Sequence, residues 1–283
     1  MMAALSSGDL LRRALGWSLG HARALAWLAA PAIAFALIFR FAIDWLWGDE
    51  VAAMFAGQAP SGTGALAVML SMLVLLFAIA LIAVSWHRYV LRGVLAPFPA
   101  DAATFRFALY QIWLGILGMF AAVAGLFVLS LLFGLVGGPS LLRAMADGGA
   151  SGGMLGILTI SGLVTILSTV PFAFYGLVLP AIAIGDRGLT AAESSRLLRG
   201  RRLAVLGALV VAWLGLFLVA IGLGLVLDAI LPEEQGLGLV TLVVDLVSLA
   251  LTAIEVSVFA GILSELYRDL RLPELARGGG VPE

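Results

Sequence analysis

Residues 239–264 read LVTLVVDLVSLALTAIEVSVFAGILS, and this stretch decides the fold class. A helix needs about 20 mostly apolar residues, at a rise of about 1.5 Å each, to cross the hydrocarbon core of a bilayer. The stretch is longer than that, and its only ionisable side chains are Asp245 and Glu255. We therefore predict that it forms a transmembrane helix.

The rest of the chain repeats this pattern. Apolar stretches with few or no charges also occupy residues 24–47, 65–86, 109–134, 154–184 and 203–231. The chain of 283 residues is 63% hydrophobic and 12% charged, whereas ordinary soluble domains have about 45–50% and about 25%. The sequence thus predicts an all-α, polytopic integral membrane protein with six transmembrane helices.

The stretch at residues 154–184 is too long for one straight span. It contains Pro171 and Pro180, and proline lacks a backbone donor and clashes with the preceding helical turn. We expect the helix to kink or end at these prolines, with its inner end near Leu179.

Arginine supplies every basic residue of the chain, and its distribution predicts the orientation, because cytoplasmic segments of bacterial membrane proteins carry the excess of Lys and Arg. All but two of the 16 basic residues fall on one predicted side, the exceptions being Arg143 in an opposite loop and Arg40 inside a span. The opposite loops are acidic or glycine-rich, with Glu233 and Glu234 in the last of them. We expect a bacterial inner-membrane protein with both termini in the cytoplasm. Residues 1–283 would form a single transmembrane domain, with a cytoplasmic interfacial helix at 1–23, a six-helix membrane bundle at 24–264 and a cytoplasmic tail at 265–283.

Helix-start signals recur on the predicted cytoplasmic side. A Ser or Thr followed three residues later by an acid caps a helix N-terminus, as at Ser6 and at Thr190, and Asp101 precedes a similar segment. We interpret the three segments as amphipathic helices in the inner interface, with leucines towards acyl chains and arginines towards headgroups. The last segment carries a candidate surface for anionic lipids, formed by Arg196, Arg199, Arg201 and Arg202.

Each of these segments precedes a predicted pair of spans, which suggests three units of about 90 residues. The second span of each pair ends near a tyrosine, at Tyr89, Tyr175 and Tyr267. An equally good explanation is that any protein that obeys the positive-inside rule acquires arginine-rich helix starts. Independently of the repeat, we expect Trp86 and His87 to be interface anchors at the inner membrane surface.

The apolar stretch at residues 239–264 also carries a polar stripe. Thr241, Asp245, Ser248, Thr252 and Glu255 are spaced by four, three, four and three residues, so they share one face of a helix. An acid facing lipid would cost about 2.5–3.5 kcal/mol on insertion scales, so the stripe must face other helices or water. Asp245 and Glu255 are either proton-carrying groups or acids that fix helix packing by hydrogen bonds.

Arg40 and Asp44 lie one helical turn apart in the first predicted span, which favours a mutually neutralised pair. Arg40 is also the natural partner for Asp245, which lies at a comparable depth. The candidate intramembrane polar site is therefore made up of Asp245, Ser248, Thr252, Glu255, Arg40 and Asp44.

Two patterns predict how helices pack. Gly118 with Ala122 puts small residues four apart, which lets another helix approach closely. Residues 161–175 carry a milder polar stripe, including Ser168, that could face the stripe of residues 241–255. Such hydroxyls more often bond the preceding turn of their own helix.

Several kinds of chemistry are disfavoured. Gly149–Gly153 reads GASGG and resembles the GxSG motif of rhomboid proteases. Ser151 would need a base, but the only histidines, His21 and His87, are predicted on the opposite side of the membrane. With no cysteine and two distant histidines, we expect no metal site and no cofactor. A net charge of -1 disfavours nucleic acid as a partner.

Some local strings resemble a known group. They are WHRYVL at Trp86–Leu91, LPAIA at Leu179–Ala183, the segment Glu193–Gly200, and Tyr267–Arg268. They resemble proteobacterial six-span proteins similar to the membrane domain attached to some glycerophosphodiester phosphodiesterases. The resemblance implies a bacterial inner-membrane protein with six helices, and it supplies no catalytic residues.

These observations lead to two main functional hypotheses. The first, which the sequence favours, is a non-enzymatic accessory or membrane-organising protein, whose arginine surface contacts membrane lipids, a protein partner or another copy of the chain. The second is a small-solute or proton-coupled carrier that uses Asp245 and Glu255. It would gain support if both acids line one continuous polar cavity that reaches a membrane face, whereas acids packed against hydroxyls in a dry core would favour the first hypothesis. An intramembrane hydrolase is a weaker third possibility.

Overall fold

The computed structural model describes residues 6–55, 61–135, 149–230 and 237–277, and every regular element in these ranges is a helix. The predicted all-α class is therefore confirmed. In chain order the elements are α1 (Ser7–Gly20), α2 (Ala22–Phe55), α3 (Gly62–Arg92), α4 (Ala102–Leu135), α6 (Gly149–Tyr175), α7 (Val178–Ile184), α8 (Ala191–Leu197), α9 (Arg202–Ile230), α10 (Leu237–Leu270) and α11 (Leu272–Arg277).

The long helices fit a membrane. Within the described ranges, five helices are long and apolar enough to cross a bilayer, and the number rises to six if α6 and α7 form one bent span. Large apolar side chains point outwards: Phe120 and Phe127 on α4 and Leu218 and Leu225 on α9 are 63–67% exposed. Soluble proteins rarely expose large contiguous apolar surfaces, so the chain is a membrane-embedded protein.

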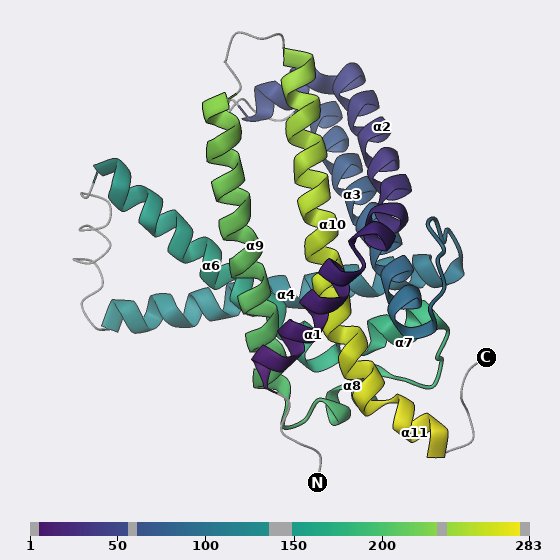
Figure 1. Cartoon of the computed structure of the whole chain (residues 1–283). Helices are drawn as coiled ribbons and strands as arrows, with labels where there is room; N and C mark the ends of the chain where they lie inside the picture. Colours follow the sequence, from purple (N-terminus) through teal and green to yellow (C-terminus); the bar gives the residue numbers. More distant parts are fainter. Residues whose placement is uncertain (1–5, 56–60, 136–148, 231–236, 278–283) are drawn as a thin grey trace.

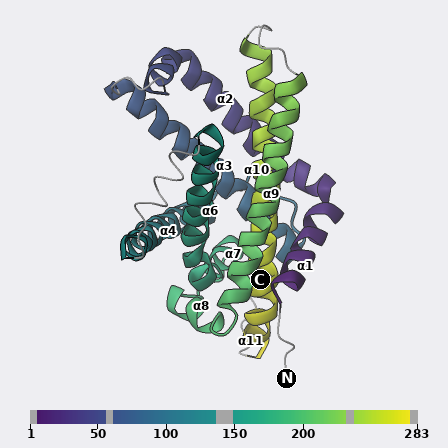
Figure 2. The same cartoon turned by 90° about the vertical axis from the view of Figure 1, so that its left-hand side faces the viewer.

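The long helices pack as three antiparallel hairpins, α2 with α3, α4 with α6, and α9 with α10. In Figure 1, α9 and α10 stand upright and α4 and α6 project to one side. Figure 2 shows that α2 and α3 lean away from α9 and α10 towards their far ends. The three hairpins therefore diverge from a common end of the molecule.

That common end, which we call the base, consists of α1, α7, α8 and α11 with the adjoining ends of the long helices (Figure 1). The largest cluster of buried residues draws Leu10 from α1, Val84 from α3, Leu114 from α4, Leu209 from α9 and Ile262 from α10. Apart from Arg40 in α2, the arginine-bearing segments of the described chain gather there as well, as predicted. Arg143, Glu233 and Glu234 lie outside the described residues.

The two predicted capping boxes are confirmed. The Ser6 side chain accepts a hydrogen bond from the Asp9 N–H, and the Thr190 side chain accepts one from the Glu193 N–H. The third predicted interfacial segment is not a separate helix, because Asp101 caps α4 itself: its Oδ1 accepts from the Thr104 N–H at 3.0 Å. That segment forms the first turns of a membrane helix.

The apolar face of α1 packs on protein rather than on acyl chains, so that part of the interfacial prediction is wrong. Leu10 and Ala14 are fully buried. A Cβ built on Gly261 of α10 would lie 3.2 Å from the Cβ of Ala14, which shows how closely α1 and α10 approach. Trp17 Nε1 also donates to Glu265 Oε1 at 3.0 Å.

The long fourth span is broken, as predicted, but the break lies between the two prolines, and Pro171 lies inside α6. α6 ends at Tyr175, and its last part meets α7 at an angle of 59°. Pro180 lies in the first turn of α7, where its missing N–H is tolerated. A Cβ on Gly176, at the break, would lie 2.9 Å from Leu263 of α10, so the turn packs closely on that helix. The predicted inner end at Leu179 thus falls inside α7, after the bend.

The predicted seam of small residues on α4 is confirmed. A Cβ built on Gly118 would lie 2.5 Å from the Ser168 carbonyl oxygen, so the backbones of α4 and α6 are in close contact. The α6 stripe does not face the α10 stripe, because α6 packs chiefly on α4 and α9. Ser168 Oγ donates to the Val164 carbonyl of its own helix at 2.8 Å, which is the usual behaviour of such hydroxyls.

Candidate functional site

The polar stripe of α10 separates into two edges, because residues ten apart in a helix differ by about 80° around its axis. Asp245 lies on one edge and Glu255 on the other, with Ser248 and Thr252 between them. Each acid lines a different, mainly apolar cavity, so the two acids do not line one continuous polar cavity, and Thr252 is the one described lining residue that the two cavities share. We call them the Arg40 cavity and the Glu255 cavity.

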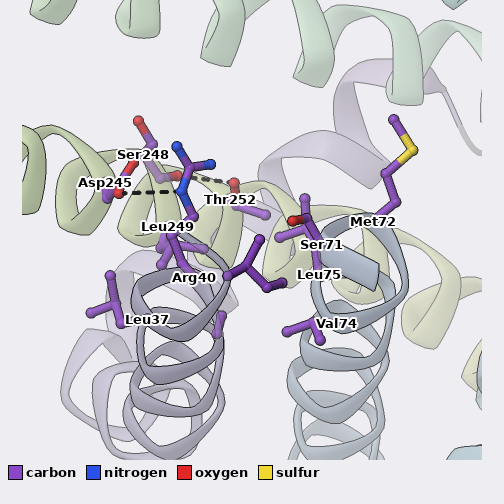
Figure 3. A pocket seen from close by; sticks show the side chains of 12 residues that line it. Leu37, Arg40, Ser71, Met72, Val74, Leu75, Asp245, Ser248, Leu249 and Thr252 are labelled. Carbon is purple, nitrogen blue, oxygen red and sulfur yellow. Dashed lines mark hydrogen bonds and ion pairs between the residues drawn. The ribbon is translucent and has the colours of Figure 1, made fainter. Parts of the chain in front are cut away.

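The Arg40 cavity has a volume of about 250 Å³ and lies between α2, α3 and α10. Figure 3 shows the Arg40 guanidinium beside Asp245 and Thr252 of α10, with Ser71 and Leu75 across from them on α3. Arg40 Nε is 2.9 Å from Asp44 Oδ2 and 4.0 Å from Asp245 Oδ2. The predicted pairing of Arg40 with both acids is therefore present.

The Arg40 cavity contains or adjoins three ionisable side chains, Arg40, Asp44 and Asp245. Its two nearest acids, Asp44 and Asp245, outnumber the single guanidinium of Arg40, so with both acids ionised the cluster carries one excess negative charge. The hydroxyls are already occupied: Ser71 Oγ donates to the Ala67 carbonyl and Thr252 Oγ1 to the Ser248 carbonyl, both at 2.9 Å.

The Glu255 cavity has a volume of about 260 Å³ and lies towards the base. Helices α3, α4, α6, α7, α9 and α10 all contribute to its lining. All three hairpins therefore meet at this cavity, and α2 is the one hairpin helix that does not line it. The lining is mainly apolar, and its polar members are His87, Gln111, Thr252 and Glu255. A mostly apolar cavity with a few convergent polar groups is the usual form of a small-molecule site.

His87 is fully buried, so the prediction that it anchors the chain at the interface is wrong. Its Nδ1 is 2.7 Å from Ser264 Oγ, whereas its Nε2 is buried and has no hydrogen-bond partner among the described residues. The neighbouring Trp86 is also fully buried, against Leu28 and Ala260. Both side chains belong to the protein core.

Gln111 and Glu255 complete the polar part of this cavity. Gln111 Oε1 is buried without a partner, and no described residue gives Glu255 a hydrogen bond or an ion pair. A buried polar group without a partner costs free energy. His87, Gln111 and Glu255 thus each have at least one polar atom in this cavity that makes no hydrogen bond to a described residue.

Sequence reasoning singled out Glu255 but missed His87 and Gln111 as its neighbours. Gln111 carries an amide side chain within the apolar stretch of residues 109–134. A polar residue in a predicted span could have identified it as a candidate site residue. The position of His87 beside Trp86 and Arg88 suggested the interface instead.

The predicted arginine surface is divided between solvent-facing and inward-facing side chains. Arg196 and Arg199 are exposed, whereas Arg201 and Arg202 are half-buried. Arg202 Nη2 donates to Ser195 Oγ at 2.7 Å, and its guanidinium lies 4.0 Å from the centre of the Phe174 ring. Arg196 lies 3.6 Å from Glu193.

A buried ionic network at the base joins α7, α8, α10 and α11. Asp186 accepts hydrogen bonds from Tyr267 at 2.7 Å and from Arg271 at 3.1 Å, and Arg271 also donates to Glu193 at 3.0 Å. Burial alone raises the pKa of Asp186, but the hydrogen bonds from Tyr267, the Gly188 N–H and Arg271 outweigh it and hold that pKa below its ordinary value.

The serine of the candidate protease motif, Ser151, falls in the first turn of α6. Its side chain lies outside the part of the chain that the structure describes. Among the described residues, no group of three His, Asp or Glu side chains is placed to hold a metal ion.

Comparison with protein-family models, with curated proteins and with solved structures found no match to this chain. The resemblance to the membrane domain of glycerophosphodiester phosphodiesterases therefore stays an expectation from sequence. The function must be inferred from the two cavities alone.

Proposed function

We propose that the protein is a proton-coupled carrier for a small solute in the bacterial inner membrane. It would have six spans, with α6 and α7 counted as one, and both termini in the cytoplasm. The observation that carries the proposal is that Thr252 lines both cavities, so that the Arg40 cavity and the Glu255 cavity adjoin along α10.

The polar groups of the two cavities follow one another along α10. At about 1.5 Å per residue, Asp245 lies about 15 Å from Glu255 and about 28 Å from Ser264, which contacts His87. The hydrocarbon core is about 30 Å thick. The series Asp245, Thr252, Glu255 and Ser264 is thus long enough to lead a solute across most of a membrane.

The acids supply the coupling. A carboxylate within a membrane must be neutralised by a proton or by a cation, because an isolated charge there is costly. Asp245 has Arg40 as a partner, whereas Glu255 has no partner among the described residues. A proton on Glu255 therefore serves as its counter-charge until a solute arrives.

The experiment uses the purified full chain in liposomes that contain a pH-sensitive dye. Small amines, amino acids and carboxylates are added one class at a time, and the internal pH is recorded. We expect one class to move protons through the wild-type protein and not through Glu255→Gln. Asp49→Asn is the matched control, because Asp49 is an exposed acid that lines neither cavity. Proton movement with no class, or equal movement in Glu255→Gln, would reject the carrier function.

A further inference from the structure

We propose that the Glu255 cavity binds a small amphipathic organic cation, a protonated primary amine with an apolar body, in exchange for the proton of Glu255. This inference rests on the proposed carrier function and names the class of its solute. It stands on three convergent polar side chains from three helices, Glu255 on α10, Gln111 on α4 and His87 on α3.

The two atoms of the cavity that are buried without a partner among the described residues, Gln111 Oε1 and His87 Nε2, can both accept hydrogen bonds. Glu255 offers two carboxylate oxygens, and Gln111 offers its unpartnered Oε1. In the tautomer whose Nδ1 donates to Ser264, the unpartnered Nε2 of His87 is an acceptor as well. A primary ammonium group has three donors and no acceptor, so it matches the three side chains one to one.

The rest of the lining fits an apolar body. It includes the rings of Phe107, Phe172 and Phe259, which pack well against hydrocarbon and whose faces attract cations. A volume of about 260 Å³ equals that of about eight or nine water molecules at roughly 30 Å³ each. That space suits an amine of about nine non-hydrogen atoms.

Charge favours a cation in this cavity over one in the Arg40 cavity. In the Arg40 cavity, Asp44 and Asp245 already share the Arg40 guanidinium as a counter-charge within 4.0 Å. The lining residues of the Glu255 cavity include no basic group other than His87. Glu255 is therefore the acid that is open to a ligand.

The exchange balances in atoms and charge. The Glu255 carboxylic acid loses its proton to solvent, and the arriving ammonium pairs with the carboxylate that remains. His87 is the one other titratable side chain in this lining, since the residues from α4, α6, α7 and α9 carry no ionisable group. Proton and amine thus compete for a single carboxylate, which is the condition for coupled exchange.

Calorimetry on the detergent-purified full chain tests this inference with three molecules of similar shape. The cationic probe is 2-phenylethylammonium, the neutral one is 2-phenylethanol and the anionic one is 3-phenylpropanoate. We expect the cation to bind at least tenfold more tightly than either control. Titrations in two buffers of different ionisation enthalpy should show that about one proton is released per amine bound.

Variants locate the site. Glu255→Gln should weaken amine binding at least tenfold, Glu255→Asp should retain most of it, and Gln111→Leu should weaken it severalfold. Asp49→Asn, at an exposed acid that lines neither cavity, should leave it unchanged. Equal binding of the alcohol, or amine binding without proton release by the wild-type protein, would overturn the inference even if no variant folds.

The two proposals can fail separately. If the amine does not bind but another solute class moves protons in liposomes, the amine inference is wrong and the carrier function stands. If the amine binds with proton release but moves no protons across the liposome membrane, the binding site stands and the carrier function is rejected.

Discussion

Tyr267 donates a hydrogen bond to Asp186 over 2.7 Å, and this contact joins α10 to the turn that follows α7. Both side chains are buried, and Arg271 donates to the same Asp186 oxygen at 3.1 Å. The contact lies at the base, close to where α7 contributes Leu179 to the Glu255 cavity. It fixes the short helix that follows the 59° bend.

Removing the Tyr267 hydroxyl should loosen the base. Tyr267→Phe deletes one hydrogen bond to a charged acceptor, and we expect the free energy of unfolding to fall by about 1.5–3 kcal/mol. Unfolding in detergent, followed by circular dichroism, measures the change. Tyr89→Phe is the control, since the Tyr89 hydroxyl makes no hydrogen bond within the described residues, and an equal loss there would contradict the assignment.

The same carboxylate predicts how stability depends on pH. The pKa of Asp186 in the folded protein lies below its ordinary value of 3.8. Its contribution to stability is therefore fully present above that value and is lost as the pH falls through the lower, folded pKa. We expect the melting temperature of the wild type to fall more steeply than that of Asp186→Asn when the pH is lowered below about 4. Parallel curves would show that Asp186 is not the group responsible.

The local features of the fold could be predicted from the sequence because they depend on neighbours in the chain. The caps at Ser6 and Thr190 involve residues three positions apart. The break before α7 is consistent with Pro180, which is tolerated in the first turn of a new helix but cannot donate to the Gly176 carbonyl in a helix that continues unbroken from α6. Arg40 and Asp44 face each other because they are one helical turn apart.

The candidate site could be predicted only in part, since it depends on which helices pack against each edge of α10. The sequence spacing predicted that Asp245 and Glu255 share one stripe of α10. They line different cavities because α2 packs beside Asp245 and α4 packs beside Glu255. His87 and Gln111 reach Glu255 from other hairpins, and a local pattern contains no information about such pairings. Trp86 is a second example. The sequence alone does not distinguish an aromatic residue at the lipid interface from one in the protein core, because both can lie at the end of a span.

The orientation of the protein can be tested with reporter fusions. A reporter joined after Ala146 should be active outside the cytoplasm, and one joined after Gly200 should be active inside it, because the arginine-bearing base is expected to face the cytoplasm. Fusions that report the same side at both positions would reject six spans with both termini inside.

The divided arginine surface predicts different roles for two neighbouring residues. Arg199 is exposed, so Arg199→Gln should weaken the binding of anionic lipid to the detergent-solubilised protein about fivefold, since one basic residue near such a lipid surface contributes about 1 kcal/mol. Arg202→Gln should instead lower stability, because the Arg202 guanidinium contacts Ser195 and Phe174. The amount of anionic lipid that co-purifies with the protein measures the first effect, and thermal unfolding measures the second. Lipid association that is unaffected by Arg199→Gln would argue against the membrane-organising role.

The contact between α4 and α6 depends on the absence of a side chain at Gly118. A Cβ there would lie 2.5 Å from the Ser168 carbonyl oxygen, a backbone atom that cannot move without shifting α6. We expect Gly118→Ala to destabilise the protein by about 1–3 kcal/mol, the usual cost of overpacking. Gly115→Ala, on the same helix, meets nothing within 4 Å and should be neutral or stabilising by up to about 1 kcal/mol through helix propensity. Melting temperatures of the two variants in one detergent decide the matter, because equal responses would mean that the two hairpin arms are not in backbone contact at Gly118.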